Sequence, residues 1–239
     1  MDESNPMNQT IIQYQQQIAS YAGKLFRDHF GKGPESAVVS IGSKYITVYF
    51  RNFLTPSERV LLEQDHEMIV DQMRETLLQT MIPEFASYIE IVTGVKPQEF
   101  YYDWSLHNKS GMLIAICPEP IPGGQDVNQD YAGKAELEQE IVNISHQAQK
   151  VPEEIVSFEI NPRTILIIRN GILVRIEKEL IRLGHSELLK SVKRNLEKSY
   201  LHNNISFEGI LKKRVVDAFV DWKFDSDSSV IVLVLNPAK

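Results

Sequence analysis

The chain has 239 residues, of which 43% are hydrophobic and 24% are charged, and its formal net charge is -7. Such a chain is a globular protein with room for one large domain or two small ones, and its acidic balance argues against nucleic acid as a partner. The single cysteine, Cys117, excludes an internal disulfide and favours a reducing cytoplasm.

The sequence also argues against insertion into a membrane. Its unbroken apolar runs have the length of strands, far below the roughly 20 residues of a membrane-spanning helix. The start, MDESNPMNQT, has neither the basic nor the apolar region of a secretion signal. We therefore expect a cytoplasmic protein that is peripheral to a membrane only through a partner.

The first predicted elements are a helix and a hairpin. Apolar positions at helical spacing predict a helix over 8–30, and the run Gly31-Lys32-Gly33-Pro34 ends it. Two short runs rich in Val, Ile, Tyr and Phe then predict strands over 37–41 and 45–51.

A long helix with a strong start is predicted over 54–80. Thr55 suits the cap, Pro56 suits the first helical position, and Glu58 stands where a capping-box carboxylate reaches back. Residues at steps of three and four then form one stripe, which we expect to face a core. The stripe consists of Leu62, His66, Ile69, Met73 and Leu77.

The remainder of the first half predicts a short helix and a second hairpin. Pro83 removes a helical hydrogen bond and is expected to break the long helix. A short helix over 84–93 follows, closed by Gly94 in a left-handed conformation. Strands are predicted over 99–107 and 112–117.

The sequence contains this pattern twice. An offset of 118 residues places Asp103-Trp104 on Asp221-Trp222, and an offset of 119 places the first long helix on a second one. We therefore expect a tandem duplication with units at 8–118 and 134–238. A linker rich in proline and glycine, at 119–133, separates them.

Each half indicates an α+β unit with the order helix, hairpin, long helix, short helix, hairpin, and with a four-stranded antiparallel sheet. In the second half we expect a helix over 135–149, strands over 155–160 and 164–170, and a helix break at Asn203-Asn204. The last strand of each half is apolar at every position, so both its faces should be covered. The sister unit is the simplest cover, which predicts an internal pseudo-dimer.

Two histidines, His66 and His185, occupy the same helical position in the two halves. Such a pair can hold a metal or sense pH, but no further metal-ligand spacing accompanies it. Because both residues lie on the apolar stripe, we expect hydrogen-bonded core histidines, and we expect neither a metal nor a cofactor.

Four residues are candidate ligand contacts. Lys32 and Gly33 follow a helix end, where a lysine and free amides can bind an anion, but a helix stop with a tight turn is the favoured explanation. Asp103 and Asp221 lie on predicted strands, each with a tryptophan on the opposite face. A structural or surface role is favoured for them, and a recurring charged site is the alternative.

Charged side chains on the two long helices are candidate protein contacts. At an offset of 119, the acidic residues Glu63, Asp71 and Glu75 correspond to the basic residues Arg182, Lys190 and Arg194. Because the charges are reversed, we expect these two helix faces to lie close to each other. For the basic stripe as a whole a solvated face is the default interpretation, and contact with anionic lipid or nucleic acid is a further alternative. The stripe consists of Lys178, Arg182, Lys190, Arg194 and Lys198.

Several motifs of the first half together carry a family resemblance. They are Gly31-Lys32-Gly33-Pro34, Leu54-Thr55-Pro56-Ser57-Glu58, Val92-Thr93-Gly94-Val95, and Asp103 in a strand before an apolar final strand. In this order they resemble the MpsC-like family. The resemblance implies the soluble component of a cation-translocating, membrane-potential-generating system, and it supplies no catalytic residues. The second half is similar through the internal repeat and is divergent, with Leu173-Val174-Arg175 in place of the Leu-Thr-Pro start.

Three classes of function fit the sequence. No nucleophile elbow, nucleotide-binding loop or metal-ligand spacing appears, which argues against an enzyme. The favoured hypothesis is a non-catalytic accessory or interaction protein of a membrane cation or inorganic-carbon transport system, with protein partners or further copies of itself. A sensor or regulator that binds a small molecule or an anion is the alternative, and an unrecognised enzyme is the third class.

Overall fold

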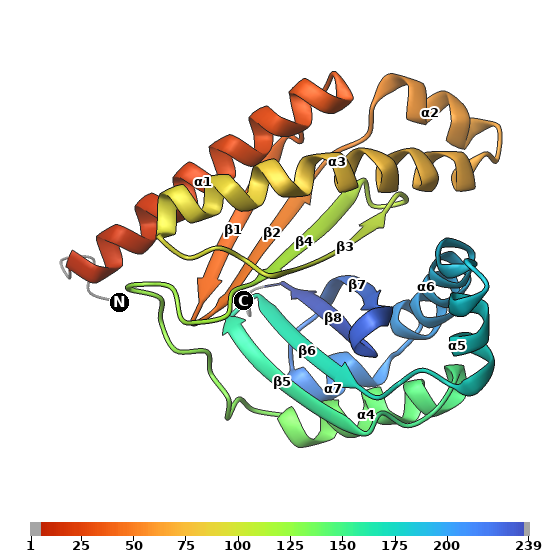
Figure 1. Ribbon diagram of the computed structural model, residues 1–239. Helices are drawn as coiled ribbons and strands as arrows, with labels where there is room; N and C mark the ends of the chain where they lie inside the picture. The colour runs from red at the N-terminus through yellow and green to blue at the C-terminus, as the bar shows by residue number, and fades with distance from the viewer. Residues whose placement is uncertain (1–5, 237–239) are drawn as a thin grey trace. The chain divides into compact units, whose positions relative to one another are not determined.

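The computed structural model describes residues 6–236 and divides the chain into two compact units (Figure 1). The first unit runs to residue 100 and continues over 104–126, whereas the second takes in 101–103 and the chain from 127 onward. Three residues of a first-repeat strand thus group with the second unit. The predicted unit end at 238 lies outside the described residues. Internal pseudo-dimer packing stays a prediction.

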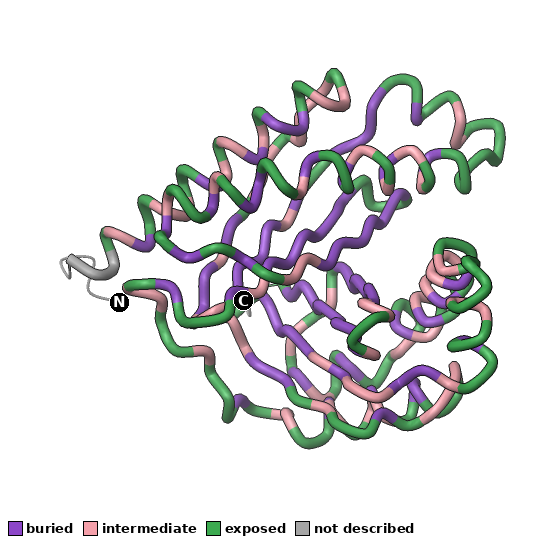
Figure 2. The backbone as a smooth tube through the Cα atoms, in the orientation of Figure 1, coloured by how far each residue is buried: buried purple, intermediate pink, exposed green. Residues whose placement is uncertain are grey.

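The first unit is an α+β unit, as predicted. Its elements are α1 (Pro6–Phe30), β1 (Ser36–Gly42), β2 (Tyr45–Arg51), α2 (Pro56–Glu63), α3 (Glu67–Thr93), β3 (Glu99–Ser105) and β4 (Ser110–Ile116). The strands form one antiparallel sheet in the order β1-β2-β4-β3. Helices α1 and α3 pack together over the sheet (Figure 1), and the strands are mostly buried while the outer sides of the helices are exposed (Figure 2).

The predicted long helix over 54–80 is wrong, because the chain turns between α2 and α3. Gln64 caps the end of α2, and Asp65 adopts a left-handed conformation with φ of 59°. Aspartate tolerates this conformation better than most residues, so the turn needs no glycine. Gly184 stands at the equivalent place in the second repeat, with φ of 82°.

The predicted break at Pro83 is also wrong, because α3 continues through it to Thr93. Pro83 is exposed, so the carbonyl that loses its helical donor can face water. Buried residues on both sides, Met81 before and Phe85 after, anchor the helix across the proline. The helix ends as predicted at Gly94, which has φ of 78°.

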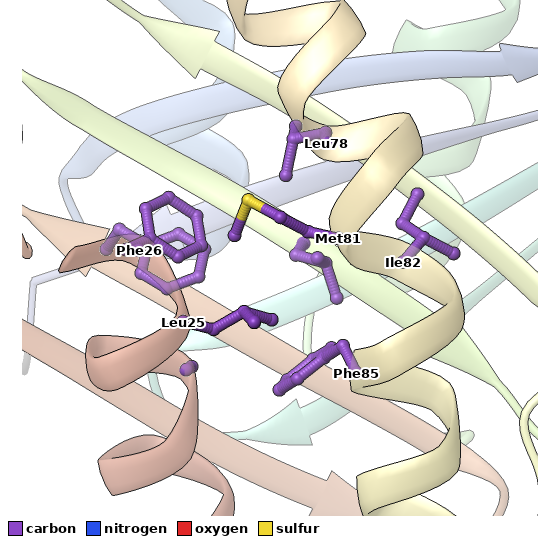
Figure 3. Close-up of a pocket in the computed structure, with 9 residues that line it drawn as sticks. Leu25, Phe26, Leu78, Met81, Ile82 and Phe85 are labelled. Carbon is purple, nitrogen blue, oxygen red and sulfur yellow. The ribbon is translucent and has the colours of Figure 1, made fainter. Parts of the chain in front are cut away.

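A small apolar cavity lies between α1 and α3 (Figure 3). Leu25 and Phe26 reach it from α1, and Leu78, Met81 and Phe85 reach it from α3. Its volume of about 10 Å³ is that of a single water-sized sphere, and the residues lining it are apolar. The cavity is therefore a gap in the packing and has no room for a ligand.

The second unit repeats the arrangement with one more helix. Its elements are α4 (Lys134–Ala148), β5 (Glu154–Asn161), β6 (Thr164–Asn170), α5 (Arg175–Arg182), α6 (Ser186–His202), α7 (Ser206–Leu211), β7 (Val215–Lys223), η1 (Phe224–Ser226) and β8 (Ser228–Leu235). The strand order is β5-β6-β8-β7, equivalent to that of the first sheet. Leu137 and Ile141 of α4 and Leu201 of α6 pack with Ile231 and Leu233 of β8 in the core. The apolar strands β4 and β8 are buried along almost their whole length, as predicted.

The segment predicted as a linker is hydrogen-bonded at both ends. Ser43 accepts a hydrogen bond from the Ile121 amide at 3.0 Å and donates its own amide to Gln125 at 2.6 Å. Further along, Asn128 forms a two-way bridge to Glu159 of β5, at 3.0 Å each way. The stretch between these two attachments is therefore only Asp126 and Val127 long.

Candidate functional site

A buried ion pair joins helices α2 and α3 of the first unit. The Arg74 Nε donates to Glu58 Oε1 at 2.8 Å, its Nη2 donates to Glu58 Oε2 at 3.0 Å, and both side chains are fully buried. The guanidinium also lies 4.5 Å from the Trp104 ring centroid and 4.9 Å from that of Phe53. Glu58 completes the predicted capping box with Thr55, so one carboxylate fixes both the start of α2 and its contact with α3.

The charge of Glu58 is stabilised in this environment. Burial alone raises the pKa of Glu58, but the hydrogen bonds and charge of Arg74 and the hydrogen bonds of Thr55 outweigh it and lower the pKa below 4.5. Removal of one partner from such a buried pair is strongly destabilising, because the other charge is left uncompensated. We therefore assign Glu58 and Arg74 a structural role.

The second unit keeps this pair as Glu177 and Lys193, with Lys193 Nζ 2.6 Å from Glu177 Oε1. The lysine also donates to Gln149, whose amide nitrogen donates to Glu197 at 2.8 Å. Glu197 in turn forms an ion pair with Arg169 at 2.8 Å. The result is a chain of five buried or half-buried polar side chains in place of one ion pair.

Burial lowers the pKa of Lys193 below its ordinary value of 10.5, although Glu177 and Glu197 act in the opposite direction. The ammonium lies 5.4 Å from the ring centroid of Trp222, the counterpart of Trp104. Sequence reasoning missed both clusters. The signal was present, because the offset of 119 places Glu58 on Glu177 and Arg74 on Lys193, so both repeats keep opposite charges sixteen residues apart.

A third charged cluster gathers the two aspartates that were predicted as candidate ligand contacts. Asp103 and Asp221 are almost completely buried in the second unit. Arg194 lies 3.1 Å from a carboxylate oxygen of each, Lys198 lies 3.0 Å from Asp103, and Lys190 lies 3.0 Å from Asp221. The structure thus brings together two predicted ligand residues and two predicted interaction residues.

The same aspartates bind main-chain amides. Asp103 accepts from the Val220 amide at 3.0 Å, and Asp221 accepts from the Tyr102 amide at 2.8 Å. Because residues 101–103 belong to the second unit, this exchange attaches them to β7. The prediction of a solvated basic face is wrong for Lys190, Arg194 and Lys198, since all three are half-buried against these carboxylates.

The other predicted site residues lie apart from this cluster. The Lys32 ammonium donates to the Leu54 carbonyl at 2.8 Å. A Cβ at Gly33 would lie 2.8 Å from Cγ of Arg27 and 3.0 Å from the Gly23 carbonyl, so close packing requires glycine there. The Gly33 contacts pack this turn against α1, and the Lys32 hydrogen bond ties it to the residues just before α2.

The predicted charged contacts are dispersed over the helices. Glu63 is exposed at the end of α2, and Arg182 is exposed at the end of α5, where it pairs with Glu179 at 2.8 Å. Asp71 and Glu75 are partly exposed on α3. That the acidic and basic faces lie close to each other stays a prediction.

The prediction of core histidines is wrong. His66 and His185 both precede the first residue of a helix, α3 and α6, and both are exposed. They are exposed because the chain turns immediately before them and carries them away from the sheet. Among residues 6–236, no group of His, Cys, Asp or Glu side chains is arranged to hold a metal ion.

The apolar stripe expected to face the core points outward. Ile69 is 48% exposed, and Leu62, Met73 and Leu77 are half-buried, whereas Val70, Arg74 and Leu78 on the adjacent face are buried. The prediction assumed one continuous helix. Because the chain turns at Asp65, α3 has a different rotation about its axis, and its core face lies one residue after the predicted stripe. We call Leu62, Ile69, Met73 and Leu77 the first apolar face.

The second repeat has the same outward stripe. At the offset of 119, its members are Ile181, Leu188, Val192 and Leu196, which we call the second apolar face. Leu188, Val192 and Leu196 are 59%, 55% and 41% exposed. Exposed apolar residues that form a helical stripe mark an interaction surface more often than isolated ones do.

A family model described as "Na+-translocating membrane potential-generating system (MpsC)" matches residues 10–119 and again residues 133–237. The chain belongs to the MpsC family. The two matches bear out the tandem repeat and the resemblance seen in the sequence. The search of curated proteins and the search of solved structures found no match.

This MpsC family chain thus carries two family segments, and each supplies an outward apolar face and the equivalent buried charged pair, Glu58–Arg74 or Glu177–Lys193. Within the part of the chain that the structure describes, no helix has the length and apolar character that crossing a membrane requires.

Proposed function

We propose that this protein is a non-catalytic, cytoplasmic accessory component of a membrane cation-translocating system, and that its two apolar faces bind a protein of that system. The family description names a Na+-translocating, membrane-potential-generating system. Ion translocation across a bilayer requires membrane-spanning segments, so a chain without such a helix in its described residues would act through a partner.

One observation carries the proposal. Apolar residues at equivalent positions of both repeats, such as Ile69 and Leu188, are outward-facing and exposed. Full burial of a leucine or isoleucine side chain contributes about 1.5–3 kcal/mol, so several such residues on one stripe supply a useful share of a binding energy. Duplication of the stripe gives the protein two docking surfaces of the same kind.

The buried charges support this function indirectly. Arg74 and Lys193 lie on the inner sides of α3 and α6, and each fixes its helix through an ion pair to the preceding helix. Each apolar face is therefore held on a rigid element, which reduces the entropy lost on binding.

Affinity capture from native membranes tests the proposal. The tagged full chain is incubated with gently solubilised membranes, and the retained membrane proteins are identified. We expect a cation transporter with the wild-type chain, and loss of it with the double variant I69K/L188K. The matched control is T76K/N195K, because Thr76 and Asn195 are equivalent, exposed and polar positions on the same two helices. Recovery of no ion-transport protein, or equal recovery by both variants, would contradict the proposal.

A further inference from the structure

The turn between α2 and α3 is an exposed acidic surface. Residues 60–68, which we call the acidic elbow, contain Glu63, Asp65 and Glu67 and no lysine or arginine, so their formal charge is -3. All three carboxylate-bearing residues are exposed, and none forms an ion pair with any residue of 6–236. Two apolar side chains flank them, Val60 at 52% exposure and Met68 at 61%.

Helix α5 of the second unit carries the opposite charge. Its exposed charged residues are the basic Arg175, Lys178 and Arg182 and the acidic Glu179, which sum to +2. Two strongly exposed apolar residues accompany them, Ile176 at 67% and Leu183 just beyond the helix at 60%. Helix α5 is therefore a basic and apolar surface. Its charge is opposite to that of the acidic elbow, and both surfaces expose apolar side chains.

The ion pairs already present on α5 do not remove this complementarity. Arg182 pairs with Glu179 one turn away, and Lys178 pairs with Asp227 at 2.9 Å, with both lysine and arginine side chains more than half exposed. Exposed pairs of this kind contribute about 0–1 kcal/mol each, so their cations remain available to a second carboxylate.

We propose that a second copy of this chain covers the acidic elbow, with α5 of one copy seated on the elbow of the other. Each copy carries one elbow and one α5, so two copies that exchange these surfaces have two equivalent contacts available to them. The apolar residues supply the buried area, and the charges fix the register and favour this pairing over elbow against elbow.

The occupant follows from charge. An anionic membrane surface would be repelled by three carboxylates, and an acidic partner likewise. The complementary surface in this chain is α5, which has basic and apolar residues on one short exposed helix. The inference goes beyond the proposed function, because it uses neither Ile69 nor Leu188.

Charge reversal in the full chain tests the dimer. Sedimentation velocity measures association of the wild type over a range of concentrations, at low and high salt. We expect a dimer that weakens with salt, and about a tenfold or larger loss of dimer affinity in E63R/E67R and in R175E/R182E. Circular dichroism checks that each variant is folded; all four positions are exposed, so we expect native spectra.

An equimolar mixture of the two variants is the decisive experiment. In E63R/E67R both surfaces of a copy are basic, and in R175E/R182E both are acidic, so each variant alone repels itself. An equimolar mixture pairs a basic elbow with an acidic α5 and an acidic elbow with a basic α5. We therefore expect the mixture to form heterodimers at wild-type affinity. A wild type that is monomeric at every concentration, a dimer unaffected by either reversal, or a mixture that stays monomeric would overturn the proposal.

Discussion

The two units bury their charges differently on the same framework. In the first unit, the Arg74 guanidinium binds Glu58 through two nitrogens and lies over the rings of Trp104 and Phe53. In the second unit, Lys193 has a smaller charged group that cannot bind in this fork-like way, and Gln149 fills the space beside it. A change of one cation thus accompanies a change in its whole surroundings.

The second unit also contains a further buried ion pair, which the first unit lacks at the equivalent positions. Arg169 and Glu197 are buried and paired, whereas their counterparts are the exposed Arg51 and the apolar Leu78. The first repeat therefore packs its core with aromatic and aliphatic side chains, and the second tolerates a buried ionic chain. The comparison predicts that charge removal acts differently in the two units.

The largest effect is expected from Arg74→Met. This change leaves the Glu58 carboxylate buried without its cation, which should cost about 3–5 kcal/mol in the free energy of unfolding of the first unit. Denaturant unfolding, followed by tryptophan fluorescence, measures it. The double variant R74M/E58Q removes the uncompensated charge and should recover part of the loss. Equal stability of R74M and wild type would contradict the assigned role of the pair.

A smaller loss is expected from Arg169→Met in the second unit. Glu197 would keep its hydrogen bond from Gln149 and the nearby positive charge of Lys193, so the expected cost is that of charged hydrogen bonds, about 1.5–3 kcal/mol. The variant R169M/E197L, which installs the leucine of the first repeat, should be more stable than R169M. If both variants unfold at the same denaturant concentration, an apolar residue at position 197 does not stabilise the second unit, which would contradict the proposed equivalence of the two repeats.

The pH dependence should also separate the units. The pKa of Glu58 is lowered, so the stability it contributes is present above about pH 4.5 and is lost as the pH falls through the lowered value. The pKa of Lys193 is lowered by burial, so its contribution rises with pH between the lowered value and 10.5. Acid and alkaline unfolding of E58Q and K193M should show these dependences removed, each in one unit. An unchanged pH profile in both variants would refute the assignment.

The smallest stability effect is expected on the apolar faces. Ile69→Lys and Leu188→Lys change exposed positions, so each should alter the free energy of unfolding by less than about 0.5 kcal/mol. Thermal unfolding of the single variants checks this. A large loss in either would mean that the residue packs in the fold, and the surface would no longer qualify as a docking face.

The sequence predicted most of the fold from local patterns. The hairpins follow from Val- and Ile-rich runs, and the duplication from a constant offset. The helix break at Asp65 was missed because neither glycine nor proline marks it, although Gly184 marks the equivalent turn in the second repeat. The order of the strands in each sheet could not be predicted from the sequence, because it depends on contacts between strands far apart in the chain.

The candidate surface was identified in the sequence but placed on the wrong side. Leu62, Ile69, Met73 and Leu77 have the spacing of a core stripe, and pattern alone cannot distinguish a core face from a docking face. The buried face of α3 contains Arg74. Sequence pattern assigns an arginine to the surface, and only its ion pair with Glu58 explains its burial. The Asp103 and Asp221 cluster required tertiary contacts and was predicted only as a pair of candidate residues.

Site-specific photo-cross-linking in intact cells tests the central claim most directly. A photoreactive amino acid replaces Ile69 or Leu188, and, as matched controls, Thr76 or Asn195. The proposed function predicts cross-links from positions 69 and 188 to the same membrane ion-transport protein, with little or no product from positions 76 and 195. Equal yields from all four positions, or no cross-link to a membrane protein from 69 and 188, would contradict the claim that the duplicated apolar faces are docking surfaces.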